Sequence, residues 1–316
     1  MKNMFRTTVA ALGMAAMASG AIAADWTPPG PIKFIIAFAA GGGADTQARM
    51  IAEELEAANG WKIIPEQVTG KGGLNAVKAL ADEPKDGTAI AMIVTETLGY
   101  NLAAANAGDP ASAATAITST AGSQMAVVSL SSKGYKTMAD VIAAAKGGEE
   151  IRFGVMSPSL ADLAYVIGKE NGVEFNIISV RGGRAVMNGL TAGDMDVGFG
   201  AGIQAKAVAA GEMVELASAK SEPLAGTPDA PLLSEFGVKF PNDTMFMIAG
   251  PADMDPAARE AIAAAIAGVL NADGSKAGGF INKAFGGVDL RTGGELDALI
   301  ANAYNDAGGL LKASAE

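Results

Sequence analysis

The stretch FAAGGGAD, Phe38–Asp45, decides the fold because it lies where a buried strand passes into a helix. Before it, the run from Ile32 to Phe38 is almost wholly apolar, which is typical of a parallel strand covered on both faces. After it, apolar residues recur at helical spacing from Ala48 to Ala58. A glycine turn at such a junction leaves backbone N–H groups and the positive end of the helix free to bind an anion. The opening of the chain therefore predicts an anion site.

The glycines do not match the known nucleotide-binding loops. A GxGxxG loop that starts at Gly41 would need a glycine at Thr46, and no GxxxxGK[ST] sequence occurs in the chain. The loop therefore favours a small anion over a dinucleotide. The sequence leaves one alternative open, in which the glycines form only a tight turn and Asp45 caps the helix.

Residues 1–23 have the pattern of a secretory signal peptide. Lys2 and Arg6 form a basic start, a weakly apolar core follows, and Ala21–Ala23 is an A-x-A cleavage site. No apolar run in the chain reaches the roughly 18 residues of a membrane-spanning helix. We expect cleavage after about Ala23 and a periplasmic mature protein.

The composition argues against several functions. The formal net charge is −11 and no basic patch with interleaved aromatic residues occurs, so we expect no nucleic-acid partner. The chain has no histidine and no cysteine, and thus lacks the commonest general base and two common metal ligands. Asp194 and Asp196 lack the further oxygen ligands of an EF-hand loop, so we interpret them as part of a structural turn. We expect no metal and no cofactor, and an anion must be held by local donors.

Strands and helices alternate along the chain, which predicts an α/β fold with parallel sheets. Strands are expected at residues 32–38, 62–68 and 89–94. Ligands bind beyond the carboxyl ends of the strands in open sheets of this kind. Besides Phe38–Asp45, those ends carry a glycine loop that ends at Gly73 and the pair Thr95 and Thr97. Both hydroxyls are candidate donors, although Thr97 is equally suited to begin a helix.

Two similar junctions occur in the second half of the chain. A predicted strand at 151–156 runs into Ser157–Ser159, and another at 175–180 runs into Arg181–Arg184. Each is followed by apolar residues at helical spacing. These junctions again present hydroxyl, backbone and guanidinium donors.

The chain is expected to pass between two lobes twice. The β-prone stretch Ile117–Leu130 is long enough to leave one lobe near Ser123 and enter the other, and the strand Thr244–Ala249 leads back. We predict a first lobe of residues 24–123 and 244–316 and a second lobe of residues 124–243. Two crossover strands and a cleft between lobes suit hinge closure around a ligand.

The C-terminal part of the chain is predicted to be helical. Ala-rich helices are expected at 257–270 and 295–311, with a loop of low order propensity at 271–279 between them. The apolar faces of both helices are expected to pack on the first lobe.

Four blocks of the sequence, in this order, resemble the periplasmic solute receptors of tripartite tricarboxylate transporters, the Bug-type receptors. The blocks are PIKFIIAFAAGGGAD, EQVTGKGGLNA, KDGTAIAM and VRGGRAVMNGLTAGDMDVGF, at residues 31–45, 66–76, 85–92 and 180–199. The resemblance covers most of the mature chain. It implies a two-lobed Venus-flytrap receptor of the type II periplasmic-binding class, a small organic acid as ligand and a membrane permease as partner. A monomer is the usual state of such receptors.

The resemblance also indicates which loops close on the ligand. In that family the loops that match Phe38–Asp45, Ser157–Ser159 and Arg181–Gly183 close on a carboxylate, and a hydroxyl residue stands at the position of Thr95. The chain departs from the family at three places, which bear on the identity of the ligand more than on the fold. Gln67-Val68-Thr69 replaces Asn-Arg-Pro, Val180-Arg181 replaces Tyr-Lys, and Ala39 stands where proline is frequent.

We predict that backbone N–H groups around Gly42–Ala44 hold one carboxylate, with help from Thr95 and from a serine of the second lobe. Asp45 cannot bind a carboxylate while it is ionised, so we assign it to a water, a ligand hydroxyl or the loop backbone. The predicted ligand-binding residues are Phe38, Ala39, Gly42, Gly43, Ala44, Asp45, Gly73, Thr95, Thr97, Ser157, Ser159, Arg181, Gly182 and Gly183.

Arg181 and Arg184 flank two glycines, so one of them is a candidate for a bidentate contact with a second carboxylate. The alternative is that Arg184 faces solvent. Two arginines favour a di- or tricarboxylate slightly over a monoacid.

Two other classes of function are open to such a chain. A ligand-sensing receptor that feeds a signalling protein has the same sequence features. A secreted α/β enzyme needs a nucleophile with a base, yet the chain has no histidine, no cysteine, no GxSxG and no SxxK. A binding protein without catalytic activity is therefore expected.

Overall fold

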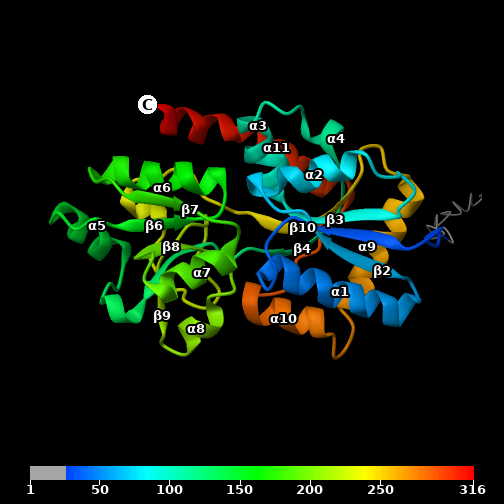
Figure 1. Ribbon diagram of the computed structural model, residues 1–316, viewed down its shortest axis with the longest axis horizontal. Helices are drawn as coiled ribbons and strands as arrows, with labels where there is room; N and C mark the ends of the chain where they lie inside the picture. Colours follow the sequence, from blue (N-terminus) through cyan, green and yellow to red (C-terminus); the bar gives the residue numbers. More distant parts are fainter. Residues whose placement is uncertain (1–25) are drawn as a thin grey trace, which may run out of the picture.

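The computed structural model describes residues 26–316, so the expected signal peptide lies outside the described part. Two five-stranded sheets, each covered by helices on both faces, form two lobes (Figure 1). The strand order is β2-β1-β3-β10-β4 in lobe 1 and β7-β6-β8-β5-β9 in lobe 2.

The strands of lobe 1 are β1 (Ile32–Ile36), β2 (Ile63–Gln67), β3 (Ala89–Val94), β4 (Thr115–Gly122) and β10 (Met245–Gly250). β1 is parallel to β2 and β3, whereas β10 is antiparallel to β3 and β4. The sheet is thus mixed and not purely parallel, which corrects the expectation from the sequence. The physical reason is that β10 arrives from lobe 2 and enters at the carboxyl end of β3, where Phe246 pairs with Val94.

Helices cover the two faces of this sheet in two groups (Figure 1). Phe34 and Ile36 point to one group and Ile35 to the other, because successive side chains of a strand alternate. The first group is α1 (Gly43–Asn59), α9 (Pro256–Leu270) and α10 (Lys276–Phe285). The second is α2 (Leu74–Ala81) and α11 (Gly293–Ala315). Shorter helical segments are α3 (Leu102–Ala104), α4 (Pro110–Ala113), a 3-10 turn at Lys71–Gly73 and a π-helical turn at Thr97–Asn101.

Lobe 2 repeats the arrangement. Its strands are β5 (Ala126–Leu130), β6 (Arg152–Val155), β7 (Asn176–Ser179), β8 (Val197–Gly200) and β9 (Met213–Ser218). α5 (Met138–Lys146) and α6 (Pro158–Asn171) cover one face, and α7 (Gly183–Ala192) and α8 (Ala205–Ala209) cover the other. Two 3-10 turns lie at Ser131–Lys133 and Leu233–Phe236. β5 enters from lobe 1 and is antiparallel to β8, so this sheet is mixed for the same reason.

The helix α10 was not predicted, because we expected a loop through residue 279. Ser275 caps α10 by accepting a hydrogen bond from the Gly278 N–H at 2.8 Å. Ala277, Ile281 and Phe285 then form a buried stripe at helical spacing. Two glycines at 278 and 279 lower helix propensity and hide this stripe in the sequence, but burial of the apolar face overrides propensity.

The lobes are connected at a hinge and by the last helix. The chain crosses from β4 to β5 at Ser123, whose N–H donates to the Thr244 carbonyl at 2.8 Å, so both crossings run side by side. α11 reaches beyond lobe 1, contrary to expectation, and its residues Ala307 and Leu310 pack with Val166 of α6. No helix within residues 26–316 is both long enough and apolar enough to cross a membrane.

Candidate ligand-binding site

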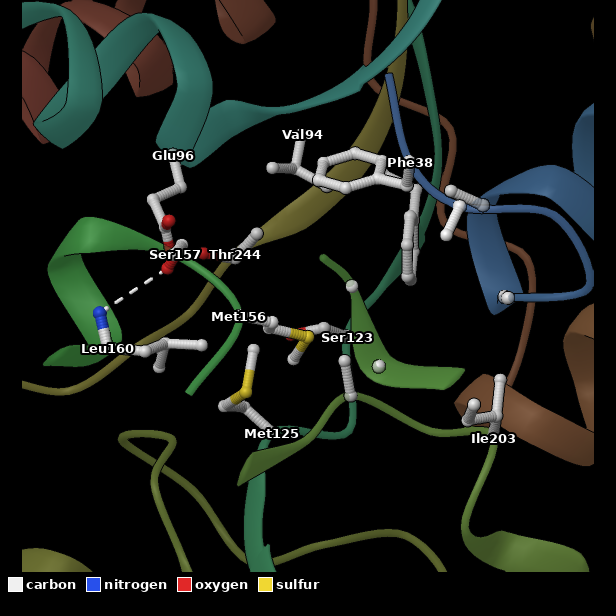
Figure 2. A pocket seen from close by; sticks show the side chains of 18 of the residues that line it. Phe38, Val94, Glu96, Ser123, Met125, Met156, Ser157, Leu160, Ile203 and Thr244 are labelled. Carbon is white, nitrogen blue, oxygen red and sulfur yellow. Dashed lines mark hydrogen bonds between the residues drawn. The ribbon is translucent and has the colours of Figure 1, made fainter. Parts of the chain in front are cut away.

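A cavity lies between the lobes, at the carboxyl ends of strands from both sheets (Figure 2). Its volume, including the part open to solvent, is about 650 Å³. Most of the side chains in its wall are apolar, namely Phe38, Val94, Met125, Met156, Leu160, Ile203, Phe246 and Phe285. The cavity therefore suits a small ligand with an apolar part.

The turn Gly41–Gly43 forms one wall of the cavity and leads into α1. Gly41 has a left-handed φ of 70°, and the Gly42 N–H donates to the Ala39 carbonyl at 3.2 Å. A Cβ on Gly43 would lie 2.8 Å from Phe285 Cζ, so only glycine fits there. No side chain caps α1 at Gly42. The first-turn N–H groups of α1 are consequently available to an anion.

Asp45 holds this turn in place. The residue is 4 % exposed, and its carboxylate accepts from the Gly41 N–H and from Arg49 Nε, both at 2.8 Å. Gln67 Nε2 donates to Asp45 Oδ1 at 3.2 Å. Asp45 thus has one of its three expected roles, that of holding the loop backbone, and it lies inside α1 and not at the cap. Gln67, which the sequence marked only as a departure from the family, helps to fix the turn.

Lobe 2 contributes the starts of α6 and α7. Ser157 lines the cavity and caps α6, where its Oγ accepts from the Leu160 N–H at 3.3 Å. Gly182 and Gly183 line the cavity at the start of α7, and Gly182 has a φ of 88°, which favours glycine. A Cβ on Gly182 would lie 3.6 Å from the Ala39 nitrogen, so the starts of α7 and α1 approach each other across the cleft.

The two candidate arginines lie outside the cavity wall, and both are exposed. Arg184 Nε donates to the Gly41 carbonyl at 3.2 Å and so connects lobe 2 to the glycine turn. Neither arginine lines the cavity, and a bidentate contact of either with a carboxylate stays a prediction.

Gly73, Thr95, Thr97 and Ser159 are buried but do not line this cavity. Thr97 Oγ1 donates to the Gly72 carbonyl at 2.8 Å, and a Cβ on Gly73 would lie 2.6 Å from Thr97 Oγ1. Thr95 Oγ1 accepts from the Met245 N–H at 3.0 Å, which ties β3 to β10. Thr95 and Ser159 border an adjoining hollow, which shares Glu96 and Thr244 with the cavity. The structure therefore brings Phe38, Ala39, Gly42, Gly43, Ala44, Ser157, Gly182 and Gly183 together, with Asp45 behind them.

Three polar residues of the wall were missed by sequence reasoning, namely Glu96, Ser123 and Thr244. Glu96 lies two residues beyond β3, in helical conformation, and lines both the cavity and the adjoining hollow, whereas Thr95 lines only the hollow. Strand alternation ends at Val94 and does not extend to Glu96, so the sequence does not show that the Glu96 side chain faces the cleft. Ser123 and Thr244 were noted only as points of crossing.

Asp196 has a structural role, as the sequence suggested. Burial alone would raise the pKa of Asp196, but hydrogen bonds from Arg152 and Lys133 outweigh it and hold that pKa well below its usual range. Arg152 donates to both carboxylate oxygens at 2.9 Å. Within the described residues no group of three acidic, histidine or cysteine side chains is placed to hold a metal ion.

A two-lobed α/β fold with a cavity at the lobe junction defines the class of type II periplasmic binding proteins. The chain belongs, within that class, to the tripartite tricarboxylate transporter family receptors, whose family model matches residues 47–275. This membership confirms the resemblance seen in the sequence. The family consists of solute-binding receptors that serve a transporter, which excludes the enzyme alternative and favours transport over signalling.

Known relatives support the assignment. The chain is 27 % identical over 252 residues to the UPF0065 protein in gbd 5'region of Cupriavidus necator, covering 78 % of this chain and 76 % of that protein. It is similar in structure to the periplasmic binding protein BugD, with a TM-score of 0.79 and 18 % identity. The match covers 92 % of this chain and 99 % of that chain.

Two similar structures contain an organic acid. MatC from Rhodopseudomonas palustris, with bound malate, has a TM-score of 0.75 at 18 % identity, with 91 % of this chain and 100 % of that chain covered. R. palustris Rpa4515, with adipate, has a TM-score of 0.78 at 19 % identity, with 92 % of this chain and 99 % of that chain covered. At such low identity these structures confirm the two-lobed fold and no more.

Proposed function

We propose that this protein captures a small organic acid between its lobes and delivers it to the permease of a tripartite tricarboxylate transporter. The observation that carries the proposal is the approach of two helix starts, α1 from lobe 1 and α7 from lobe 2, at one wall of the cavity. Both helices begin after a glycine, with no side-chain cap. A carboxylate placed there accepts from free N–H groups of both lobes and complements two positive helix ends.

The energies of such contacts match the expected affinity. A charge-assisted hydrogen bond contributes about 1.5–3 kcal/mol, so three or four of them approach the roughly 8 kcal/mol of a micromolar complex after the costs of association. Because the contacts come from both lobes, the acid binds the closed arrangement better than an open one and draws the lobes together. The malate of MatC and the adipate of Rpa4515 support an acid as the ligand.

The proposal also covers location, lobe boundaries and partners. We propose that cleavage after about Ala23 releases a monomer into the periplasm, with residues 24–123 and 244–316 as one lobe and 124–243 as the other. Mass spectrometry of the protein from a periplasmic extract tests the cleavage site, and size-exclusion chromatography with light scattering tests the monomer. Loss of acid uptake on deletion of the gene supports delivery to a permease, whereas unchanged uptake supports the sensing alternative.

Calorimetric titration of the mature protein with matched pairs of a carboxylic acid and its primary amide tests the site. We expect at least one acid to bind while its amide binds at least about tenfold more weakly, because the amide lacks the charge that the helix starts stabilise. If no acid binds and another class of solute does, the proposal is wrong.

Replacement of Ser157 sharpens the test. Ser157→Ala removes a hydroxyl donor from the cavity wall together with the cap of α6. Ser275→Ala removes the cap of α10, outside the cavity wall, and is the matched control. Both changes should lower the free energy of unfolding by about 1 kcal/mol. Only Ser157→Ala should also weaken acid binding.

A further inference from the structure

Glu96 is the only ionisable side chain in the described part of the cavity wall. It is 8 % exposed and lies two residues after β3, in helical conformation. Glu96 Oε1 accepts from Asn101 Nδ2 at 3.2 Å, and Glu96 Oε2 accepts from Asn242 Nδ2 at 3.0 Å. Both carboxylate oxygens are therefore held by neutral amides, and no ion pair with Glu96 occurs within residues 26–316.

The position of Glu96 separates it from the starts of α1 and α7. In Figure 2, Glu96, Ser157 and Thr244 are grouped on one side of the cavity, and Phe38 and Ile203 lie on the other. Phe38 directly precedes the glycine turn of α1, and a Cβ on Gly43 would lie 3.1 Å from Ile203. One side of the cavity thus has free N–H donors and the other has an acceptor that carries a negative charge.

Ser123 provides a second, independent indication that a polar ligand atom enters the cavity. Its side chain is 1 % exposed, and Ser123 Oγ has no hydrogen-bond partner among the described residues. A buried hydroxyl without a partner is costly, so a native fold normally supplies one. Because Ser123 lines the cavity, a ligand can supply it.

We infer that the cavity selects monocarboxylates that have an apolar body and a hydrogen-bond donor, a hydroxyl or an ammonium group, at the far end. The inference rests on the proposed function, because it places the single carboxylate at the starts of α1 and α7. The hydroxyl or ammonium group at the far end of the ligand then donates to Glu96. Ser123 contacts the same polar group or a water bound beside it. A second carboxylate would meet Glu96 in a buried site with no cation in the wall, which is strongly unfavourable. This reverses the slight preference for a di- or tricarboxylate that two arginines suggested.

Calorimetric titration of the mature wild-type protein with two series of acids tests the inference. The six-carbon series is hexanoate, 6-hydroxyhexanoate, 6-aminohexanoate and adipate, and the four-carbon series is butanoate, 4-hydroxybutanoate, 4-aminobutanoate and succinate. In the series that fits the cavity, we expect the hydroxy or amino acid to bind tightest and the dicarboxylate at least about tenfold more weakly. A dicarboxylate that binds tightest in wild type overturns the inference and leaves the proposed function standing.

The variant Glu96→Gln identifies the cause of the preference. It keeps the shape of the side chain and removes its charge, so the affinity for the dicarboxylate should rise about tenfold while that for the unsubstituted acid changes less than about twofold. A larger loss for the amino acid than for the hydroxy acid identifies ammonium as the preferred donor. Glu53→Gln removes an equal charge from the exposed face of α1 and should leave the order of affinities unchanged.

The remaining outcomes are also decisive. If Glu96→Gln folds and the dicarboxylate gains nothing, Glu96 does not set the preference and the inference is wrong. If that variant does not fold, the wild-type order decides alone. If none of the eight acids binds wild type, the result contradicts the proposed function, and the inference with it.

Discussion

The turn Gly41–Gly43 and the loop Gly70–Gly73 follow the adjacent strands β1 and β2 and have similar compositions, yet their surroundings differ. The first faces the cavity and is held from behind by Asp45. The second faces the interior, where Thr97 Oγ1 and Asn101 Nδ2 both donate to the Gly72 carbonyl at 2.8 and 3.1 Å. A glycine thus gives a ligand access to the backbone in one loop, and allows close packing within the protein in the other.

Gly73→Ala should give the largest effect. Gly73 has a φ of 97°, and a Cβ there would lie 2.6 Å from Thr97 Oγ1. Backbone strain and overpacking therefore both destabilise the variant. We expect the free energy of unfolding to fall by about 3 kcal/mol, while acid affinity of the folded protein stays within about twofold of wild type. Urea unfolding and calorimetric titration measure the two quantities.

Gly42→Ala is the converse of that change. Gly42 has an ordinary φ of −77°, and its nearest neighbour, the Ala39 carbonyl oxygen, would lie 3.1 Å from a new Cβ. We expect a loss of stability of only about 1 kcal/mol but acid binding at least about tenfold weaker, because a methyl group in the wall would keep the carboxylate from the N–H groups. Equal effects of both variants on stability and binding would remove the distinction between the loops.

Replacement of Asp45 tests whether the turn must be held in place. Asp45→Asn keeps the size of the side chain but weakens its contacts with Arg49 and Gln67. Loss of charge-assisted hydrogen bonds should cost about 2 kcal/mol of stability and weaken acid binding about tenfold, since the N–H groups lose their orientation. Unaltered binding in Asp45→Asn would show that the turn keeps its shape unaided.

Asp196→Asn is the matched control in lobe 2, because Asp196 is also a buried carboxylate with basic partners. The pKa of Asp196 is lowered in the folded state, against the effect of burial, by Arg152 and Lys133. Its contribution to stability is therefore present above the pKa of the unfolded chain, near pH 4, and is lost as the pH falls through the folded value. Urea unfolding should show a stability difference from wild type at pH 7 of about 2 kcal/mol that shrinks below pH 4. Acid affinity at pH 7 should not change.

Thr97→Val should give the smallest effect. It removes one buried hydroxyl donor to the Gly72 carbonyl at nearly constant volume, while Asn101 still donates to that oxygen. We expect a loss of about 1 kcal/mol in urea unfolding and no change in acid affinity. A clear loss of affinity would give the second glycine loop a part in binding.

Much of the fold followed from local patterns. The strand Ala89–Val94 has the predicted ends, because the apolar run and the turn residues before it agree there. The direction of β10 and the reach of α11 into lobe 2 could not be predicted, since both depend on how the lobes are placed in space. α10 was missed because two glycines weaken its local signal.

The parts of the candidate site that consist of backbone N–H groups were predicted from the sequence. The parts that depend on the direction of a side chain were not. The glycine turns before α1 and α7 follow from sequence, because free N–H groups need no particular side chain. Thr95 and Glu96 are neighbours, and only the tertiary structure shows which of them faces the cavity. The position of the charged Glu96 in the cavity wall could therefore not be predicted from the sequence, and neither could the proposed preference for a monoacid.

The most direct test of the central claim is a crystal structure of the mature protein with the tightest-binding acid from the titrations. We expect the carboxylate to accept hydrogen bonds from the first-turn N–H groups of α1 at Gly43 and Ala44 and from the start of α7 at Gly183. A carboxylate bound elsewhere in the cleft, with these N–H groups facing water, would contradict it.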